Sequence, residues 1–181
     1  SIRRQRQMCI RDRLDTAGGS VFPALVGKML PLVVMMLLMT LMMFLILFKI
    51  VGVPLNGSLT ALLFGCMLFV LAYMAIGVLI VTLLSNLRLS LSIGGGYSVL
   101  AFTFSGLTFP MMAMYPWVQA FSKIFPFTFY TDIFIDQALR GAPVVDSLWD
   151  MGYIALFIVL PMLCLPRLRK ICSDEKYWGR M

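Results

Sequence analysis

The sequence contains no histidine and few charged residues, and both shortages narrow the functions open to it. Histidine is the commonest general base and metal ligand, so its absence argues against most hydrolytic and metal-dependent active sites. Charged residues make up 13% of the chain, about half the share found in an ordinary globular domain. Hydrophobic residues make up 61%. The composition excludes an ordinary water-soluble domain and indicates a membrane protein.

Cysteine is also scarce, and its four positions carry no recognisable pattern: Cys9, Cys66, Cys164 and Cys172. Their spacing fits neither a metal site nor a redox pair. Cys66 and Cys164 lie in apolar stretches, where we expect them to be small packing residues. We therefore expect no metal site in this chain.

Four apolar stretches are long enough to cross a bilayer, which takes roughly 20 residues of helix because lipid offers the backbone no hydrogen-bond partners. They are residues 29–48, 59–84, 89–114 and 147–166. We expect charged side chains to be confined to the segments between and beyond them. The predicted fold class is all-α, a polytopic helical membrane protein with four transmembrane helices and a short external helical hairpin.

Residues 1–13 have a separate origin in our interpretation. The string from Arg3 to Asp12, Arg-Arg-Gln-Arg-Gln-Met-Cys-Ile-Arg-Asp, is what results from translating a transposase-type sequencing adapter in one frame. We interpret residues 1–13 as an adapter-derived artefact and leave them out of fold reasoning; the alternative is a basic juxtamembrane anchor. Residues 14–181 would then be a fragment of a longer protein. Arginines of the first stretch, offset by Asp12, supply four of the seven net positive charges, so we expect no nucleic-acid partner.

Basic residues orient the four predicted spans, because lysine and arginine collect in short cytoplasmic loops. An even number of crossings places both ends of the chain on one face. Seven basic residues fall on that face: Lys28, Arg88, Arg167, Arg169, Lys170, Lys176 and Arg180. Three fall on the other: Lys49, Lys123 and Arg140. We predict a multi-pass protein of the cell membrane with both ends, including the tail 167–181, in the cytoplasm.

The third predicted span is rich in small and hydroxylated residues, among them Gly94, Gly95 and Gly96. Small residues let helix backbones approach closely, and hydroxyls bond back to the helix or line a polar path. Tight packing against another helix and direct ligand contact are both open, and packing is the plainer interpretation. Ala61 and Gly65 form another pair with the spacing of close helix packing.

The segment 115–145 is too aromatic for a solvated loop and too interrupted to cross the bilayer again. We expect it to lie at the external interface as a helical hairpin. Pro116 and Pro126 bracket its first helix, in which Trp117 lies on the apolar face. Thr128 or Thr131 would cap the second helix, which ends at Gly141.

Three charged residues share one face of that second helix: Asp132, Asp136 and Arg140. A spacing of four lets Asp136 pair with Arg140. Two carboxylates four residues apart could also bind a cation or serve as acid and base. The absence of histidine and of a third acidic ligand nearby favours a structural ion pair.

The stretch from Ser105 to Trp117 reads Ser-Gly-Leu-Thr-Phe-Pro-Met-Met-Ala-Met-Tyr-Pro-Trp and is followed by Pro126 and Leu139-Arg140-Gly141. This arrangement resembles the last third of type-2 ATP-binding-cassette (ABC) exporter permeases, where a span leads through Ser-Gly and Phe-Pro into an outer helical hairpin. Gly27-Lys28 and the turn 53–58 look like the middle region of that family. The resemblance extends from about Val21 to Lys170.

Two positions depart from the family pattern. Tyr115 stands between Met and Pro, which are often adjacent, and Asp136 stands where a basic residue is common. Members of the family have six spans, so the resemblance implies that this chain holds the last four. Neither Tyr115 nor Asp136 changes the order of the spans.

The resemblance implies partners. Two permease subunits, identical or different, would pair around a central path, with ABC ATPase subunits docked beneath them and membrane lipids around them. ATP and Mg would be bound by the partner ATPase. The chain is not expected to be an enzyme or to bind a cofactor, because its Gly27-Lys28 has Phe22 where a phosphate-binding loop needs its first Gly, and Met29 after the Lys.

By the same resemblance, the chain would supply half of the path and one outer gate, formed by the hairpin with Pro116, Trp117, Pro126, Asp132, Asp136 and Arg140. We expect substrate contacts at four polar residues: Ser98, Thr103, Ser105 and Tyr115. The cluster Gly94 to Gly96 is the expected point of helix packing or flexing. Uncharged spans favour amphipathic drugs, lipids or lipid-linked molecules as exported substrates.

Two other classes of function were weighed against the exporter. A small integral-membrane channel or assembly scaffold would act without an ATPase partner. A membrane-embedded enzyme would need acids, histidines or metal ligands at bilayer depth, and we expect none in the spans.

Overall fold

The computed structural model describes residues 21–84, 86–107 and 110–162, and every regular element within them is a helix. The predicted all-α class is therefore confirmed. In chain order the elements are α2 (Val21–Leu45), η1 (Ile46–Ile50), α3 (Leu59–Leu84), α4 (Leu87–Phe104), η2 (Met111–Ala113), α5 (Pro116–Ser122), α6 (Pro126–Phe134), η3 (Ile135–Arg140) and α7 (Val144–Met162). The expectations for residues 1–13 and for the tail 167–181 lie outside the described residues.

Within the described residues, three helices are long and apolar enough to cross a membrane: Leu25–Ile50, Leu59–Leu84 and Val144–Pro161. The predicted span 59–84 coincides with α3. The predicted span 29–48 lies within a longer helix, because η1 continues α2 directly. The last span begins at Val144, before its predicted start, and residues 163–166 lie outside the described residues. The chain is thus a multi-pass membrane protein.

The predicted span 89–114 differs most from the structure. Its helix, α4, ends at Phe104, and Gly106 adopts a left-handed backbone with φ of 88°. Glycine in that conformation is a common helix stop, because it carries no Cβ to clash. α4 has 18 residues but is less apolar than the three candidate spans of the described residues and is not among them, so the count of four crossings stays a prediction.

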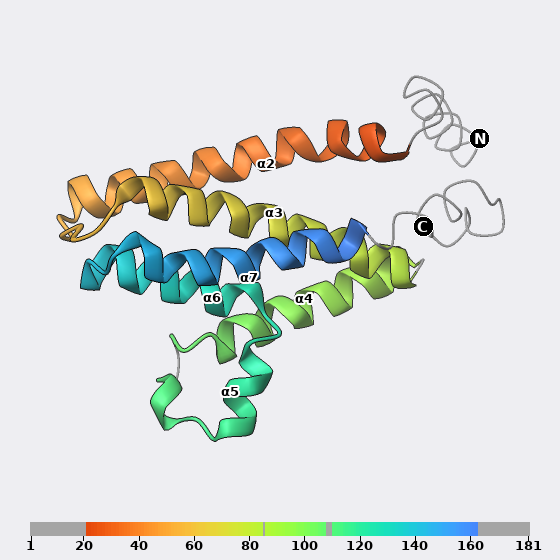
Figure 1. Cartoon of the computed structure of the whole chain (residues 1–181). Coiled ribbons are helices and arrows are strands. Elements are labelled where there is room, and N and C mark those ends of the chain that lie inside the picture. Colours follow the sequence, from red (N-terminus) through yellow and green to blue (C-terminus); the bar gives the residue numbers. More distant parts are fainter. Residues whose placement is uncertain (1–20, 85, 108–109, 163–181) are drawn as a thin grey trace.

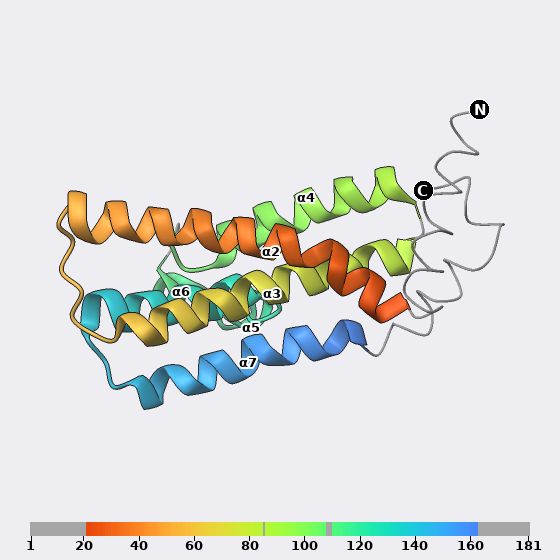
Figure 2. The ribbon, with the colours of Figure 1, turned by 90° about the horizontal axis from the view of Figure 1, so that it is seen from above.

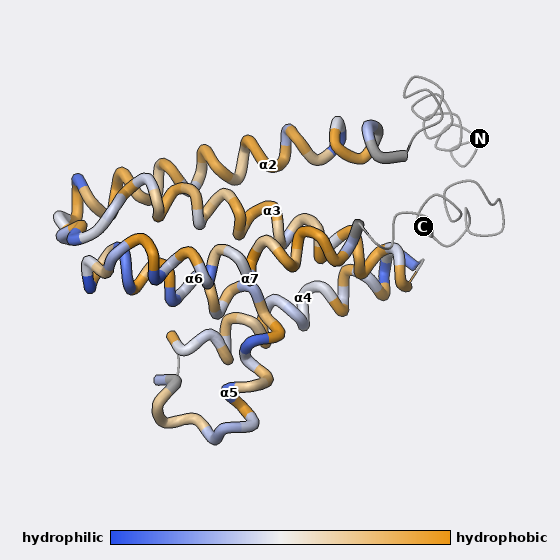
Figure 3. The backbone as a smooth tube through the Cα atoms, in the orientation of Figure 1, coloured by the Kyte–Doolittle hydropathy of each residue, from blue (hydrophilic) through white to orange (hydrophobic). Residues whose placement is uncertain are grey.

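The helices lie roughly side by side in an elongated bundle (Figures 1 and 2). α2 begins, α3 ends, α4 begins and α7 ends at one end of this bundle. The opposite end holds the connections 51–58 and 141–143; it is called the outer end below because the predicted topology places it outside the cell. Figure 3 shows apolar residues along most of α2 and α3, and polar residues gathered in α6 and η3 toward the outer end.

The hairpin is built differently from the sequence prediction. Its first helix, α5, ends at Ser122 rather than at Phe125, and its second, α6, begins directly at Pro126. Thr128 and Thr131 do not cap it: Thr128 donates to the carbonyl of Ser122, and Thr131 to that of Phe127. α6 packs against α3 and α7 rather than lying apart from the bundle. The second arm of the hairpin is therefore an integral part of the helix bundle.

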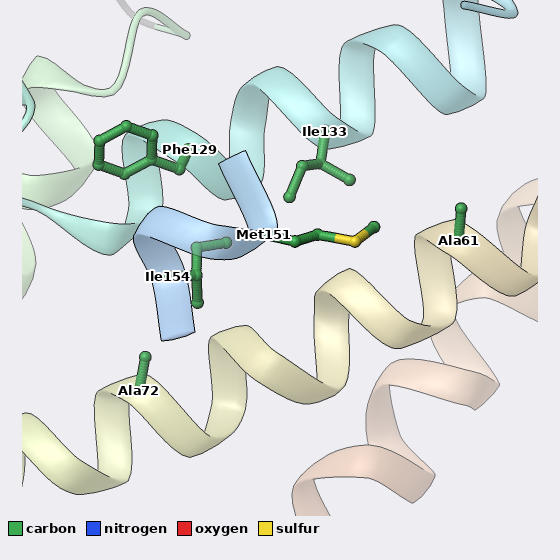
Figure 4. Packing of buried hydrophobic residues seen from close by; sticks show 6 residues of the cluster. All are labelled: Ala61, Ala72, Phe129, Ile133, Met151 and Ile154. Atoms are coloured by element: carbon green, nitrogen blue, oxygen red, sulfur yellow. The ribbon is translucent and has the colours of Figure 1, made fainter. Parts of the chain in front are cut away.

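The core lies between α3, α6 and α7 (Figure 4). Six buried side chains form it: Ala61, Ala72, Phe129, Ile133, Met151 and Ile154. A Cβ added at Gly65 would lie 3.1 Å from Cγ2 of Ile133, so the small residues of α3 admit α6 closely. This confirms the close packing predicted for Ala61 and Gly65. We call α3, α6 with η3, and α7 the three-helix block.

A second, smaller cluster joins α2 to α3. Phe44 packs against Leu62 and Cys66, and its ring lies 6.4 Å from that of Phe134. Most other large side chains of α2 are exposed, including Leu38 and Met43. In a bilayer such side chains face lipid, which is as apolar as they are, and need no protein cover.

Candidate functional site

A network of hydrogen bonds closes the outer end of the bundle around Gln137. The side chain of Gln137 is fully buried. Its Oε1 accepts a hydrogen bond from the backbone N–H of Ser58 at 3.1 Å. Its Nε2 donates to the carbonyl of Ala142 at 3.2 Å and to Oγ of Ser147 at 2.9 Å. One side chain thus ties the segment before α3 to the end of η3 and the start of α7.

Backbone contacts reinforce this network. The N–H groups of Asn56 and Gly57 donate to the carbonyls of Ala138 and Gln137, at 3.3 and 2.9 Å. Nδ2 of Asn56 donates to the carbonyl of Leu139 at 2.8 Å. We call this set the outer clamp, made of Asn56, Gly57, Ser58, Gln137, Leu139, Ala142 and Ser147.

Two glycines leave no room for a side chain beside the outer clamp. A Cβ at Gly57 would lie 2.6 Å from the carbonyl oxygen of Gln137. Gly141 has a left-handed backbone with φ of 69°, and its Cβ would lie 2.8 Å from the carbonyl oxygen of Asn56. Gly141 ends η3 as predicted. The sequence placed these residues in turns but gave no sign that the two turns meet.

The predicted ion pair is confirmed. Nη1 of Arg140 lies 3.0 Å from Oδ1 of Asp136, and Arg140 is largely exposed. The pKa of Asp132 is raised because the carboxyl is partly buried and because Asp136 is a like charge nearby; Arg140 and Lys123 oppose that shift.

Asp150 is the acidic residue that the sequence reasoning missed. It lies inside the span Val144–Pro161, so the expectation that the spans carry no charge is wrong. Asp150 is within electrostatic range of Asp132 and Asp136, because α7 packs along α6. Even so, no group of three or more acidic or cysteine side chains in the described part of the chain is arranged to hold a metal ion.

The cluster Gly94 to Gly96 faces open space. A Cβ added at any of the three glycines would meet nothing within 4 Å. Tight packing of this cluster against another helix of the same chain is therefore absent among the described residues. The cluster can instead accept a partner, lipid or ligand, or allow the helix to flex.

The four residues expected to contact substrate do not form one surface. Ser98 lies exposed and Thr103 half-buried on α4, and their hydroxyls donate to the carbonyls of Gly94 and Val99. Ser105 is buried and donates to the carbonyl of Phe102. Tyr115 is exposed beyond the end of α4, directly before α5. Ser98 and Thr103 are thus available on α4, whereas Ser105 is not.

Aromatic side chains form the contact between α4 and the hairpin, and the sequence gave no reason to pair them. The ring of Tyr97 lies 5.0 Å from that of Phe125, and the ring of Phe102 lies 6.0 Å from that of Phe127. The Tyr97 hydroxyl donates to the carbonyl of Ile124 at 3.4 Å, close to the upper limit for a hydrogen bond. We call Tyr97, Phe102, Phe125 and Phe127 the aromatic joint.

The hairpin residues singled out from the sequence take different positions. Pro116 and Pro126 each begin a helix, as the fixed φ of proline favours. Pro126 is fully buried, whereas Trp117 is exposed and contributes nothing to the core. The first arm of the hairpin therefore presents an aromatic side chain outward, while the second arm is held inside the bundle.

A groove of about 300 Å³ lies between α2, α3 and α7. Its lining comes from three helices: Leu25, Val26, Met29, Leu30, Val33 and Val34 of α2, Leu71, Met74, Ala75 and Val78 of α3, and Ile158 and Pro161 of α7. All of the lining side chains are apolar, so the groove has no group that could recognise a polar or charged molecule.

Comparison with known proteins identifies one family. The model of the ABC-2 family transporter proteins matches residues 4–164, which include every described element. The matched range also takes in residues 4–13, whose interpretation as adapter-derived stays a prediction. No curated protein and no solved structure matches the chain.

Proposed function

The chain belongs to the ABC-2 transporter family and is a permease subunit of an ABC transporter; we propose that it exports amphipathic drugs, lipids or lipid-linked molecules. The observation that carries this proposal is the pairing of apolar spans with a mildly polar α4. Ser98 and Thr103 provide hydroxyls on a helix whose glycines leave open space beside it. A surface of this kind suits a molecule that is mostly apolar with a small polar part.

The energy for transport would come from a separate subunit. An ABC-2 permease works with an ABC ATPase, and we propose that this ATPase binds ATP and Mg. We propose that two permease subunits pair around the path and that the beginning of α2 and the end of α7 face the cytoplasm. Lys28 and Arg88, both near that end of the bundle, support this orientation by the distribution of positive charge.

Asp150 places a carboxyl inside a span, and the proposed amphipathic substrate has to be compatible with it. A carboxyl inside a span is costly in lipid and is kept near protein groups or water. Asp150 follows Ser147 of the outer clamp by three residues, in the first half of α7, and α7 packs chiefly against α3 and α6. It therefore does not conflict with an amphipathic substrate on α4.

Co-purification of the protein with an ABC ATPase partner, followed by reconstitution in lipid, tests the proposal. We expect amphipathic compounds to stimulate ATP hydrolysis in the complex, and a catalytically inactive ATPase variant to show none. Failure of every amphipathic compound to stimulate hydrolysis would contradict the proposed substrate class. A chain that is active without any ATPase would favour the channel or scaffold alternative.

A further inference from the structure

The outer clamp and the core hold the same three elements together. The outer clamp joins the segment before α3, the end of η3 and the start of α7 by directional hydrogen bonds. Deeper in the bundle, Ile133 and Met151 pack against the small residues of α3 (Figure 4). The three-helix block is thus held at its outer end and along its length, and a shift of its parts would break these hydrogen bonds, including the buried one from Gln137 to Ser147.

α4 is attached to that block in a different way. Its buried side chains include Ser90, Ala101 and Ser105, which are small. The hydroxyls of Ser90 and Ser105 donate to carbonyls of their own helix, at Asn86 and Phe102. This face of α4 therefore offers a smooth surface without outward hydrogen bonds from those side chains.

Aromatic rings supply further contacts: besides the aromatic joint, the ring of Tyr97 lies 6.3 Å from that of Tyr73 on α3, and the ring of Phe104 lies 5.5 Å from that of Phe121 on α5. Ring contacts at 5.0 and 6.0 Å are weakly directional and can be replaced by similar ones after a small displacement. The hydrogen bond from Tyr97 to Ile124 is long, at 3.4 Å. Packed helices that move relative to one another do so by such small sliding motions, which leave backbone hydrogen bonds intact.

We propose that α4 slides along the aromatic joint against a static three-helix block, and that this motion opens the path at the outer side. The second arm of the hairpin, α6 with η3, then stays fixed, and the hairpin as a whole is not the moving gate. Open space beside Gly94 to Gly96 gives α4 room for the motion. This inference rests on the proposed transport function.

Reversible cross-linking tests the inference with two matched pairs of aromatic residues. Tyr97 and Phe125 lie across the aromatic joint, and Phe129 and Tyr153 lie within the block, with the same ring separation of 5.0 Å. Each pair is replaced by cysteines in a background whose native cysteines are alanine, then bridged by a bifunctional methanethiosulfonate in the reconstituted transporter.

We expect bridging of Tyr97→Cys with Phe125→Cys to abolish transport and reduction to restore it. Bridging of Phe129→Cys with Tyr153→Cys should leave transport unchanged. Any other pattern would overturn the inference, whether both bridges stop transport, neither does, or only the bridge within the block does. A transporter that moves no substrate before bridging would instead refute the proposed function.

A second measurement uses surface positions and needs no transport. Spin labels at Val99 on α4 and Leu139 on η3 measure the distance between α4 and the block. Labels at Leu139 and Leu160 on α7 measure a distance within the block. All three residues are exposed. In the chain reconstituted alone, we expect a broader distance distribution for the first pair than for the second. Equal widths would overturn the inference even if the protein transports.

Discussion

At the scale of single residues, buried polar side chains decide the structure of the outer end. Gln137 is surrounded by partners for both ends of its amide, and no buried side-chain nitrogen or oxygen among the described residues lacks a partner. Away from water, an unpaired polar group is expensive. The residues around Gln137 are therefore more sensitive to substitution than the apolar residues that face lipid.

Replacement of Gln137 by Ala should destabilise the protein by about 1–3 kcal/mol, because the Ser58 N–H and the Ser147 hydroxyl would lose a buried partner. Thermal unfolding in detergent measures the loss. Ser98→Ala is the control, since its exposed hydroxyl bonds only to its own helix, and it should change stability little. Equal stability of the two variants would contradict the role given to Gln137.

Replacement of Asp132 by Asn should have an effect that depends on pH. The folded protein raises the pKa of Asp132 by burial and by Asp136, so it binds the proton more tightly than the unfolded chain does. Stability is then greatest in acid and falls as the pH rises from the ordinary carboxyl pKa to the raised one.

Asparagine at position 132 does not titrate, so the Asp132→Asn variant does not lose stability in this way as the pH rises. We expect Asp132→Asn to be more stable than the natural protein at neutral pH and no more stable in acid, as measured by unfolding temperature at several pH values. Asp136→Asn serves as a contrast, because it also removes the ion pair with Arg140. A stabilisation that is the same at every pH would refute the assignment.

At the scale of helices, apolar length predicted α2, α3 and α7, while their ends depended on local chemistry. The long apolar run alone was enough to predict α3, and its bounds were predicted correctly. α4 ends early because Ser105-Gly106, which we had interpreted as part of a continuing span, adopts a helix-ending conformation. A glycine tolerated inside a helix and a glycine that stops one look the same in a sequence.

The site was predictable only where partners are near in sequence. The Asp136–Arg140 pair follows from helical spacing and was predicted. The outer clamp joins Asn56 to Leu139, and the aromatic joint joins Phe102 to Phe127, and neither contact leaves a periodic signal. Such contacts depend on how helices pack, which a single sequence does not specify.

Gly95→Ala tests what the glycines contribute to α4. Nothing lies within 4 Å of the added Cβ, so the change should stabilise the helix by up to about 1 kcal/mol. If the glycines allow α4 to flex, the same change should slow transport, measured as flux in vesicles. Gly57→Ala is the contrast: its Cβ would clash with the Gln137 carbonyl, so stability itself should fall. A Gly95 variant with unchanged flux would contradict the flexing role.

At the scale of the whole molecule, α3 lies at the centre of the bundle and packs against α2, α4, α6 and α7; we propose that α3, α6 with η3, and α7 form a static block. α2 rests on α3 through a small cluster around Phe44 and leaves most of its surface to lipid. α4 packs on α3 and contacts α6 through the aromatic joint. The exposed faces of these two helices are where lipid, substrate or a second permease subunit would meet the chain. The account requires the outer clamp and the beginning of α4 to lie on opposite faces of the membrane.

Single-cysteine labelling in sealed cells tests that requirement most directly. Val145 and Arg88 are exposed, lie at opposite ends of the bundle and can each be replaced by Cys in a cysteine-free background. We predict that a membrane-impermeant maleimide labels Val145→Cys in intact cells and labels Arg88→Cys only after the membrane is permeabilised. Labelling of both positions from the same side would contradict the account.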